Sequence, residues 1–386
     1  MNASSERGAP LAYGGTVPLA GTDRTGRRSR QDPLSQGVIC PMCLGEIQDW
    51  NMLDYWRWDP NQEGYVELPV PPKLNQTQLD HLLHGARVRC PASEGDTRIG
   101  PHYLPADYGR FGPPVVLGFV GLPKSGKSHL LAAMVGAIVG RELEKNCGIS
   151  SSPLDQALHR EFMDTWVSPL LKHGRVLPGT TEGVVTFADA FVIKRRDGLE
   201  QVVALFDVAG EDLARLDETK RFLWIANGLV FVIDPEHLGA QWAEDETFSN
   251  VLDVVRRSAR RHQVSAAIVL NKADMVRFEE PVDRWLRYEG SASAGGALDP
   301  VEFLRESADV YAYLDAKNAL AMAAPYEVCD KATLHVASPT GGADTGTEEG
   351  GVYPRGVTPR RVLRPLIAML AMTGVLTGPE AEKVGV

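Results

Sequence analysis

The sequence predicts an α/β fold in which helices flank a mostly parallel sheet, preceded by a small cysteine-bearing module. Three observations support this prediction. From Val115 onward, short β-branched runs alternate with helical patterns, as is typical of parallel sheets. A glycine-rich stretch, GLPKSGKS, separates the first of these runs from the first helix. Nearer the N-terminus, Cys40, Cys43 and Cys90 lie in a segment of different composition.

The helices and strands that we expect follow one another from residue 115 onward. Residues 115–120 (VVLGFV) read as the first strand, and residues 128–144 as an amphipathic helix after it. Residues 183–193 and 201–208 read as an antiparallel pair around the turn RRDG. The later strands are expected at residues 228–234, 265–271 and 333–338.

The chain divides into three parts by composition. Residues 1–36 are rich in Gly, Ser, Arg and Pro and are expected to form a disordered tail. Residues 37–110 are expected to form a small module, because they contain clustered tryptophans and three cysteines and end in a linker rich in Pro and Gly. Residues 111–386 hold the alternating pattern of the main domain.

Composition limits the classes of function. The chain has 386 residues and a net charge of −10, which argues against a general nucleic-acid or membrane-surface partner. No apolar run reaches the roughly 18–20 residues that span a bilayer, and residues 365–376 read as a packed helix. The N-terminal segment lacks a signal-peptide pattern. We therefore expect a soluble, cytoplasmic protein with reduced cysteines.

The stretch GLPKSGKS matches the phosphate-loop motif G-x-x-x-x-G-K-[ST] at each fixed position. Its glycines let consecutive backbone N–H groups point at phosphate oxygens, and the following helix adds its positive end. Lys127 is expected to reach the β- and γ-phosphates, and the Ser128 hydroxyl to bind Mg²⁺. The residues predicted to contact the nucleotide here are Gly121, Pro123, Lys124, Ser125, Gly126, Lys127, Ser128 and His129.

Two later motifs bear on the nucleotide. NKAD, residues 271–274, follows a predicted strand, where its Asp274 carboxylate can accept hydrogen bonds from N1–H and the 2-amino group of guanine. Adenine has no such donor pair and would leave the carboxylate without a partner. DVAG, residues 207–210, ends another strand. Asp207 is expected to bind Mg²⁺ there, and the Gly210 N–H to contact the γ-phosphate.

Phosphate loop, D-x-x-G and N-K-x-D occur in this order, so that residues 115–338 resemble P-loop GTPases of the translation-factor-related class. The resemblance implies a P-loop NTPase fold that hydrolyses GTP with Mg²⁺ and binds guanine through Asn271, Lys272 and Asp274. It also implies a switch-one threonine that senses magnesium and γ-phosphate. Thr180 and Thr181 are both candidates, and we prefer Thr181.

Two positions depart from the pattern of these GTPases. Ser338, in VASPTG, occupies the last guanine-contacting loop, but the usual Ser-Ala-Lys sequence is not present. Glu211 follows D-x-x-G where many relatives have Gln to orient the attacking water. Its carboxylate adds negative charge beside the γ-phosphate, so we expect slow intrinsic hydrolysis, relieved by an arginine from a partner.

The cysteine segment predicts a zinc site. CPMCLG has the C-P-x-C-x-G form of a zinc knuckle, and Cys90 supplies a third thiolate. The fourth ligand stays open between His102, His84 and His81. We prefer His102, because it follows Cys90 in extended sequence whereas the other two lie on an expected helix. Such a site would stabilise a module too small to have a sufficient core of its own.

A zinc-ribbon-like module joined to this GTPase domain is similar to the bacterial, mainly actinobacterial, double-GTPase families, which are linked to conflict systems. That resemblance implies a protein partner, a second GTPase. Two other functions stay open. A nucleotide-gated binding scaffold with little hydrolysis is consistent with Glu211, and an ATP-dependent, nucleic-acid-associated NTPase is consistent with the zinc module but conflicts with Asp274.

Overall fold

The structure, a computed structural model, describes residues 37–43, 45–91, 100–179, 185–195, 197–208, 222–239, 247–257, 264–288, 298–346 and 350–386. Its strands are β1 (Val38–Ile39), β2 (Glu46–Ile47), β3 (Tyr55–Asp59), β4 (Gly64–Glu67), β5 (Arg87–Arg89), β6 (Tyr103–Pro105), β7 (Val115–Gly121), β8 (Ser150–Pro153), β9 (Val185–Lys194), β10 (Glu200–Val208), β11 (Gly228–Ile233), β12 (Ser265–Leu270) and β13 (Ala332–Val336).

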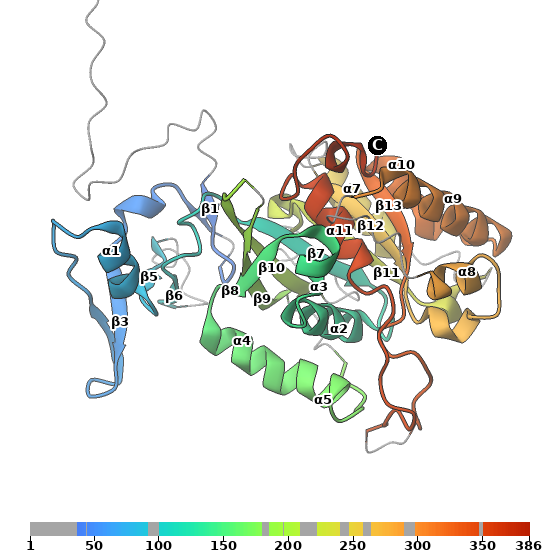
Figure 1. Cartoon of the computed structure of the whole chain (residues 1–386), viewed down its shortest axis with the longest axis horizontal. Helices are drawn as coiled ribbons and strands as arrows, with labels where there is room; N and C mark the ends of the chain where they lie inside the picture. The colour runs from blue at the N-terminus through green and yellow to red at the C-terminus, as the bar shows by residue number, and fades with distance from the viewer. Residues whose placement is uncertain are drawn as a thin grey trace, which may run out of the picture.

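The helices are α1 (Gln76–Leu83), α2 (Lys127–Val139), α3 (Glu142–Cys147), α4 (Gln156–Phe162), α5 (Ser168–Leu171), α7 (Thr247–Arg257), α8 (Val282–Arg287), α9 (Pro300–Ala316), α10 (Ala324–Val328) and α11 (Arg364–Met372). A π-helical turn, Met163–Val167, joins α4 to α5. Short 3-10 helices cover Trp50–Met52, Pro235–His237, Ala273–Val276, Leu320–Ala323 and Ala381–Lys383. Figure 1 shows how these elements are arranged.

Within the described residues, seven strands form the central sheet, in the order β13–β12–β11–β7–β10–β9–β8. The five strands from β13 to β10 are parallel, whereas β9 runs antiparallel to both β10 and β8. The predicted mostly parallel sheet and its antiparallel pair are therefore confirmed. Every residue of β7, β11 and β12 is buried, because helices cover both faces of the sheet.

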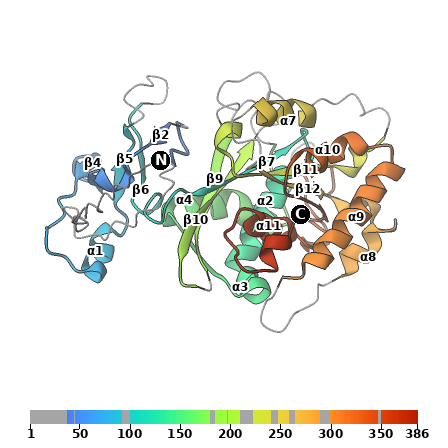
Figure 2. The ribbon, with the colours of Figure 1, turned by 90° about the horizontal axis from the view of Figure 1, so that it is seen from above.

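The two helical layers contact opposite faces of this sheet. Helices α2, α3 and α11 pack on one face, and α7, α9 and α10 pack on the other, each layer with its own apolar cluster. Figures 1 and 2 show the sheet between these layers. The carboxyl ends of the parallel strands thus meet at one edge, where ligands bind in such folds.

Helix α2 differs from the amphipathic helix expected at residues 128–144. It ends at Val139 and is buried on most of its circumference. The segment that contains α4 and α5 covers its outer side so closely that a β-carbon at Gly136 would lie 2.3 Å from Leu171 Cδ1. A sequence pattern shows which residues are apolar but not what packs against them. Here the sheet covers one side of the helix and the segment with α4 and α5 covers the other.

Helix α11 lies within the segment predicted to be a packed helix. All its residues from Pro365 to Met372 are buried, and it contacts β12 and β13. A β-carbon at Gly228 would lie 1.9 Å from Met369 Cε, so this glycine permits the close approach of α11 to the sheet. Among the helices of the described residues, none is long and apolar enough to cross a membrane.

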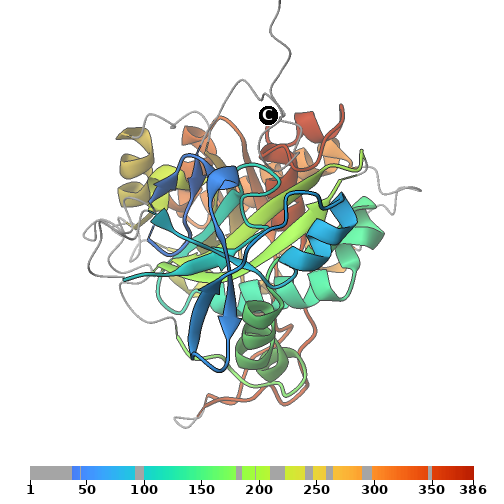
Figure 3. The ribbon, with the colours of Figure 1, turned by 90° about the vertical axis from the view of Figure 1, so that its left-hand side faces the viewer.

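The N-terminal module lies at one end of the molecule, next to β8, β9 and β10 (Figures 1 and 2). Four of its described strands form an antiparallel sheet of order β4–β3–β5–β6, and β1 and β2 form a separate antiparallel pair; Figure 3 views the molecule from that end. The buried Val88 and Leu104 belong to the same apolar cluster as Val116 of β7. In addition, Arg87 of β5 pairs at 2.5 Å with Asp155, which caps the N-terminus of α4. The module is thus packed onto the main domain.

A buried ionic cluster joins α9, β13 and α11. Glu306 of α9 is fully buried and accepts a hydrogen bond from the Val336 backbone N–H at 3.0 Å. It also contacts His335 Nδ1 at 3.2 Å, Arg361 Nη2 at 2.8 Å and Arg364 Nε at 3.4 Å. Burial by itself raises the pKa of Glu306, but the interactions with Arg361, His335 and Arg364 outweigh it and hold the pKa well below its usual range. The cluster therefore holds the end of β13 with an ionised carboxylate.

We expect Glu306→Ala to lower the free energy of unfolding by about 3–5 kcal/mol, because it removes the carboxylate that pairs with the buried Arg361 guanidinium, whereas Arg364 retains its pair with Glu302. Chemical denaturation monitored by circular dichroism measures the change. Glu380→Ala is the matched control: it breaks an exposed pair with Lys383, 3.2 Å long, and is expected to change stability by about 1 kcal/mol or less. Equal effects of the two substitutions would contradict the structural role of the cluster.

Candidate functional site

The phosphate-loop stretch connects the end of β7 to the start of α2. Lys124 and Gly126 have positive φ angles of 63° and 83°, which turn the backbone sharply before the helix begins. A β-carbon at Gly121 would lie 2.5 Å from Val232 O, so the loop also depends on a glycine at its start. The Lys127 ammonium lies across the loop and donates to Gly121 O at 2.8 Å and Leu122 O at 3.2 Å.

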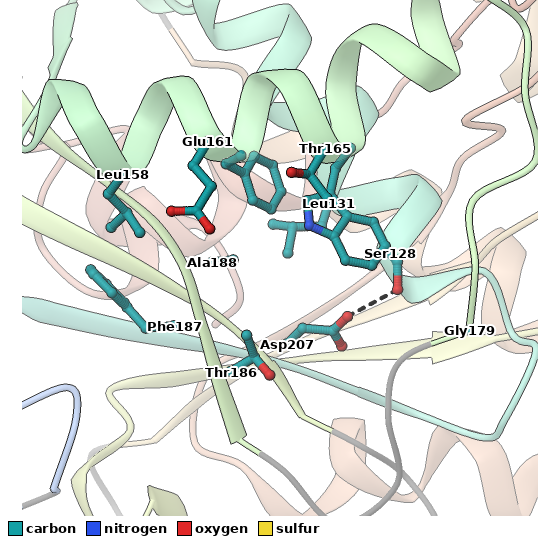
Figure 4. Close-up of a pocket in the computed structure, with 12 residues that line it drawn as sticks. Ser128, Leu131, Leu158, Glu161, Thr165, Gly179, Thr186, Phe187, Ala188 and Asp207 are labelled. Carbon is teal, nitrogen blue, oxygen red and sulfur yellow. Dashed lines mark hydrogen bonds between the residues drawn. The ribbon is translucent and has the colours of Figure 1, made fainter. Parts of the chain in front are cut away.

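Ser128 and Asp207 meet beside this loop. Because β7 and β10 are parallel neighbours, their carboxyl ends place the two side chains together, and Ser128 Oγ donates to Asp207 Oδ2 at 2.9 Å (Figure 4). A hydroxyl and a carboxylate are hard oxygen donors of the kind that Mg²⁺ prefers. The donor set therefore fits a magnesium ion.

Asn271 joins the NKAD loop to the phosphate loop. Its side chain is fully buried, and Nδ2 donates to Ser125 O at 2.9 Å and to Gly126 O at 3.3 Å. Two buried atoms, Asn271 Oδ1 and Ser125 Oγ, have no hydrogen-bond partner within the described residues. Buried polar atoms normally have partners, so this region fits a ligand with hydrogen-bonding groups of its own.

Lys272 and Asp274 are held in the same loop by different partners. Lys272 has a positive φ of 46°, and its ammonium pairs at 2.6 Å with the buried carboxylate of Asp234 at the end of β11. Asp274 accepts a hydrogen bond from the hydroxyl of Ser338. The backbones of Ser338 and Arg360 exchange hydrogen bonds of 3.0 and 2.7 Å. The structure therefore brings Asn271, Lys272, Asp274 and Ser338 together.

His129 lies directly after Ser128 and faces the NKAD side of the loop. Its Nε2 accepts a hydrogen bond from the Leu177 backbone N–H at 3.1 Å. Burial, together with the charge of Lys272, lowers the pKa of His129 to about 4, so the ring is neutral at pH 7. Pro123 and Lys124 are the exposed residues of the loop.

Some predicted residues lie outside the described part of the chain. They are Thr180, Thr181, Gly210 and Glu211. The structure adds Asp234, which sequence analysis did not assign although it is the last residue of a predicted strand at the same edge of the sheet. The other candidates of the phosphate and guanine motifs are placed around one edge, as the parallel topology requires.

A cavity of about 290 Å³ adjoins Ser128 and Asp207. Its other walls come from α4, the π-helical turn after it and the start of β9 (Figure 4). The Glu161 carboxylate is directed toward this space, and Trp166 also lines it. The helical insert between α2 and β9 therefore borders the end of the site where magnesium is expected.

Four metal-ligand side chains of the N-terminal module form a second site. Cys40, Cys43, Cys90 and His102 are buried, and their ligand atoms all lie within 4.8 Å of one another. The Sγ atoms of Cys43 and Cys90 are 3.7 Å apart, and Cys40 Sγ lies 3.1 Å from His102 Nε2. His81, on α1, and His84, just after it, are not members of this cluster.

Comparison with protein families shows to which family the chain belongs. Residues 115–312, slightly more than half of the chain, match the model of the family Double-GTPase 2. The chain belongs to the Double-GTPase 2 family. It is accordingly a GTP-binding protein, and membership implies Mg²⁺ with the nucleotide.

Solved structures similar to this Double-GTPase 2 protein include an elongation factor and a receptor. The bacterial selenocysteine-specific elongation factor EF-Sec is 15% identical, with 58% of this chain and 25% of that chain covered and a TM-score of 0.26. The mammalian SRP receptor is also 15% identical, with 58% and 91% covered and a TM-score of 0.28. The chain thus spans one quarter of the elongation factor's length. No curated protein matched the sequence.

The cysteine cluster of this Double-GTPase 2 protein fits zinc by three criteria. Three thiols and one imidazole form a common tetrahedral donor set, and Zn–S bonds of about 2.3 Å place sulfurs about 3.8 Å apart. His102 Nδ1 contacts Gly100 O at 3.0 Å, which directs Nε2 toward the thiols. Hydrogen bonds with Cys40 and Cys90 lower the pKa of Cys43, which favours a thiolate at that residue, while hydrogen bonds with Cys43 and Cys90 raise the pKa of Cys40.

We expect the purified protein to contain about one zinc per chain and Cys90→Ser to lose most of it, because three ligands bind zinc far more weakly than four. Elemental analysis after dialysis measures the metal content. Cys329→Ser is the control, since Cys329 is a buried thiol outside the cluster. Unchanged zinc content in the Cys90 variant would refute the assignment.

Proposed function

We propose that this Double-GTPase 2 protein hydrolyses GTP to GDP and phosphate and acts as a regulatory switch. The hydrogen bonds from Asn271 to Ser125 and Gly126 carry this proposal, because they join a phosphate loop to a base-reading loop in one site. A triphosphate held by the first loop would place its purine at the second.

In this proposal, backbone N–H groups of residues 121–128 bind the phosphates, and Lys127 leaves the loop carbonyls to neutralise the β- and γ-phosphate oxygens. Ser128 and Asp207 would hold Mg²⁺, directly or through water. The ion would supply positive charge for the oxygens that become more negative during transfer. The protein groups contribute position and charge rather than covalent chemistry.

Guanine would be read by Asp274 with help from its neighbours. The Ser338 hydroxyl donates to one Asp274 oxygen and so orients the carboxylate before nucleotide binds. Asp234 holds Lys272 in the adjacent position. Preorganised acceptors favour the base that has two matching donors, because adenine would leave the carboxylate unsatisfied.

The switch residues we propose are Thr181 or Thr180, which would sense magnesium and γ-phosphate, and Gly210, whose N–H would contact the γ-phosphate. Glu211 favours a second candidate function, a scaffold that binds GTP to recruit a partner but hardly cleaves it. The partner we propose is a second GTPase. Both proteins would act in the cytoplasm, as parts of one bacterial conflict system. The name of the family supports the choice of a second GTPase as the partner.

Calorimetric titration with GDP, GTP and ATP tests the proposal. We expect guanine nucleotides to bind at least about 100-fold more tightly than ATP. Asp274→Asn should weaken GDP binding about 5- to 150-fold and favour xanthosine diphosphate, whose 2-oxo group accepts from an amide. Asp253→Asn, on the exposed side of α7, is the matched control. Tighter binding of ATP than of GTP by the unaltered protein would exclude the proposed GTPase.

Single-turnover hydrolysis separates the switch from the scaffold. We expect slow phosphate release by the unaltered protein, and a roughly tenfold increase in Glu211→Gln, because the amide removes a negative charge beside the γ-phosphate. Glu200→Gln, at the exposed start of β10, is the control. Fast release without any partner would contradict the role assigned to Glu211, and none in either protein would favour the scaffold.

A further inference from the structure

The chain after β13 returns to the nucleotide site. We call residues 338–346 and 350–360 the return segment (Figure 1). At one end it pairs with itself beside the NKAD loop, where Thr358 N donates to Thr340 O at 2.9 Å. At its far end it pairs with the chain after α5, through Val176 N to Gly351 O at 2.9 Å and Tyr353 N to Gly174 O at 2.7 Å. The return segment therefore connects the guanine loop to the region that leads into switch one.

Tyr353 projects its ring from the return segment toward both nucleotide motifs. The ring lies edge-on to His129, with centroids 6.2 Å apart and an interplanar angle of 83°. Its hydroxyl interacts with the side chain of Thr340, two residues after Ser338. Burial, with the nearby carboxylates of Asp344 and Asp274, raises the pKa of Tyr353 to about 12. The phenol is thus neutral and lies near the phosphate-loop helix and the base-reading carboxylate alike.

A purine nucleotide bound at this site would occupy the space between the phosphate loop and Asp274. Its phosphates would lie at residues 121–128, directly before His129, and its pairing edge would meet Asp274. Lys272 supplies a wall from the β12 side, since its Cε and Cγ would lie 3.5 and 3.7 Å from a β-carbon at Gly126. Tyr353 contacts the ring of His129 and is close enough to Asp274 for that carboxylate to raise the pKa of the phenol.

We propose that Tyr353 is a nucleotide-binding residue whose ring packs against the guanine base on the side of the return segment; this inference rests on the proposed GTP function. The half-buried ring offers an apolar face at little conformational cost, because its backbone is already anchored to Gly174. Its contact is with the base alone, whereas residues 121–128 contact the phosphates. The ring therefore adds affinity for nucleosides and none for phosphate chains.

Binding of GDP and of inorganic tripolyphosphate to the full chain tests this assignment. Tyr353→Ala should weaken GDP binding about 5- to 150-fold, the range that base–aromatic stacking supplies, mainly through faster release. Tyr353→Phe retains the ring and should bind GDP within about threefold of the unaltered protein. Both variants should bind tripolyphosphate as the unaltered protein does. Tyr311→Ala, which removes a tyrosine of α9 paired with Glu327, is the matched control.

Two results would overturn the assignment while leaving the proposed function intact. One is unchanged GDP affinity in Tyr353→Ala. The other is an equal loss of GDP and tripolyphosphate binding, which would mean that the ring supports the loops rather than the base. If the unaltered protein bound tripolyphosphate but showed no preference for GDP over ADP, the proposed guanine specificity would fail, and the role of Tyr353 with it.

Discussion

The site depends on the hydrogen bonds of one buried amide. Asn271 lies at the end of β12, and its Nδ2 reaches the carbonyls of Ser125 and Gly126 in the loop after β7. These strands are separated by β11, so the contact spans three strand ends. The side chain is fully buried, and its removal would take a hydrogen-bond donor from both of these carbonyls. The distance between the phosphate loop and the base-reading loop is therefore set by the protein before any ligand binds.

A second set of buried polar contacts supports the loop that contains Ser338. Glu306 accepts the N–H of Val336, two residues before Ser338, and its ionic partners include Arg361. Arg360 pairs with the backbone of Ser338 itself. Helix α9 and the chain before α11 thus hold the loop on both sides. Burying a polar or charged group without a partner costs free energy, whereas a buried network is stable when each of its groups has a partner.

The N-terminal module is attached to the main domain at the start of α4. Arg87 pairs with Asp155, whose carboxylate also accepts from the N–H groups of Ala157 and Leu158 at the start of α4. Farther along, α4 and the turn after it border the cavity beside Ser128 and Asp207. The module has a small core, and four metal ligands would supply the stability that its size does not.

The sequence alone predicted the α/β fold, the positions of most strands of the central sheet along the chain and the residues of the phosphate and guanine motifs, because these are local patterns of apolarity and motif spacing. It also selected His102 among three histidines by its position in extended sequence, and the structure places that residue with the thiols. Only the tertiary structure decided the contacts of Asp234, Glu306 and Tyr353. Their partners are distant in the chain, and contacts between distant segments leave no periodic signal in the sequence. The same reason explains α2, which became buried on most sides only when the insert packed over it.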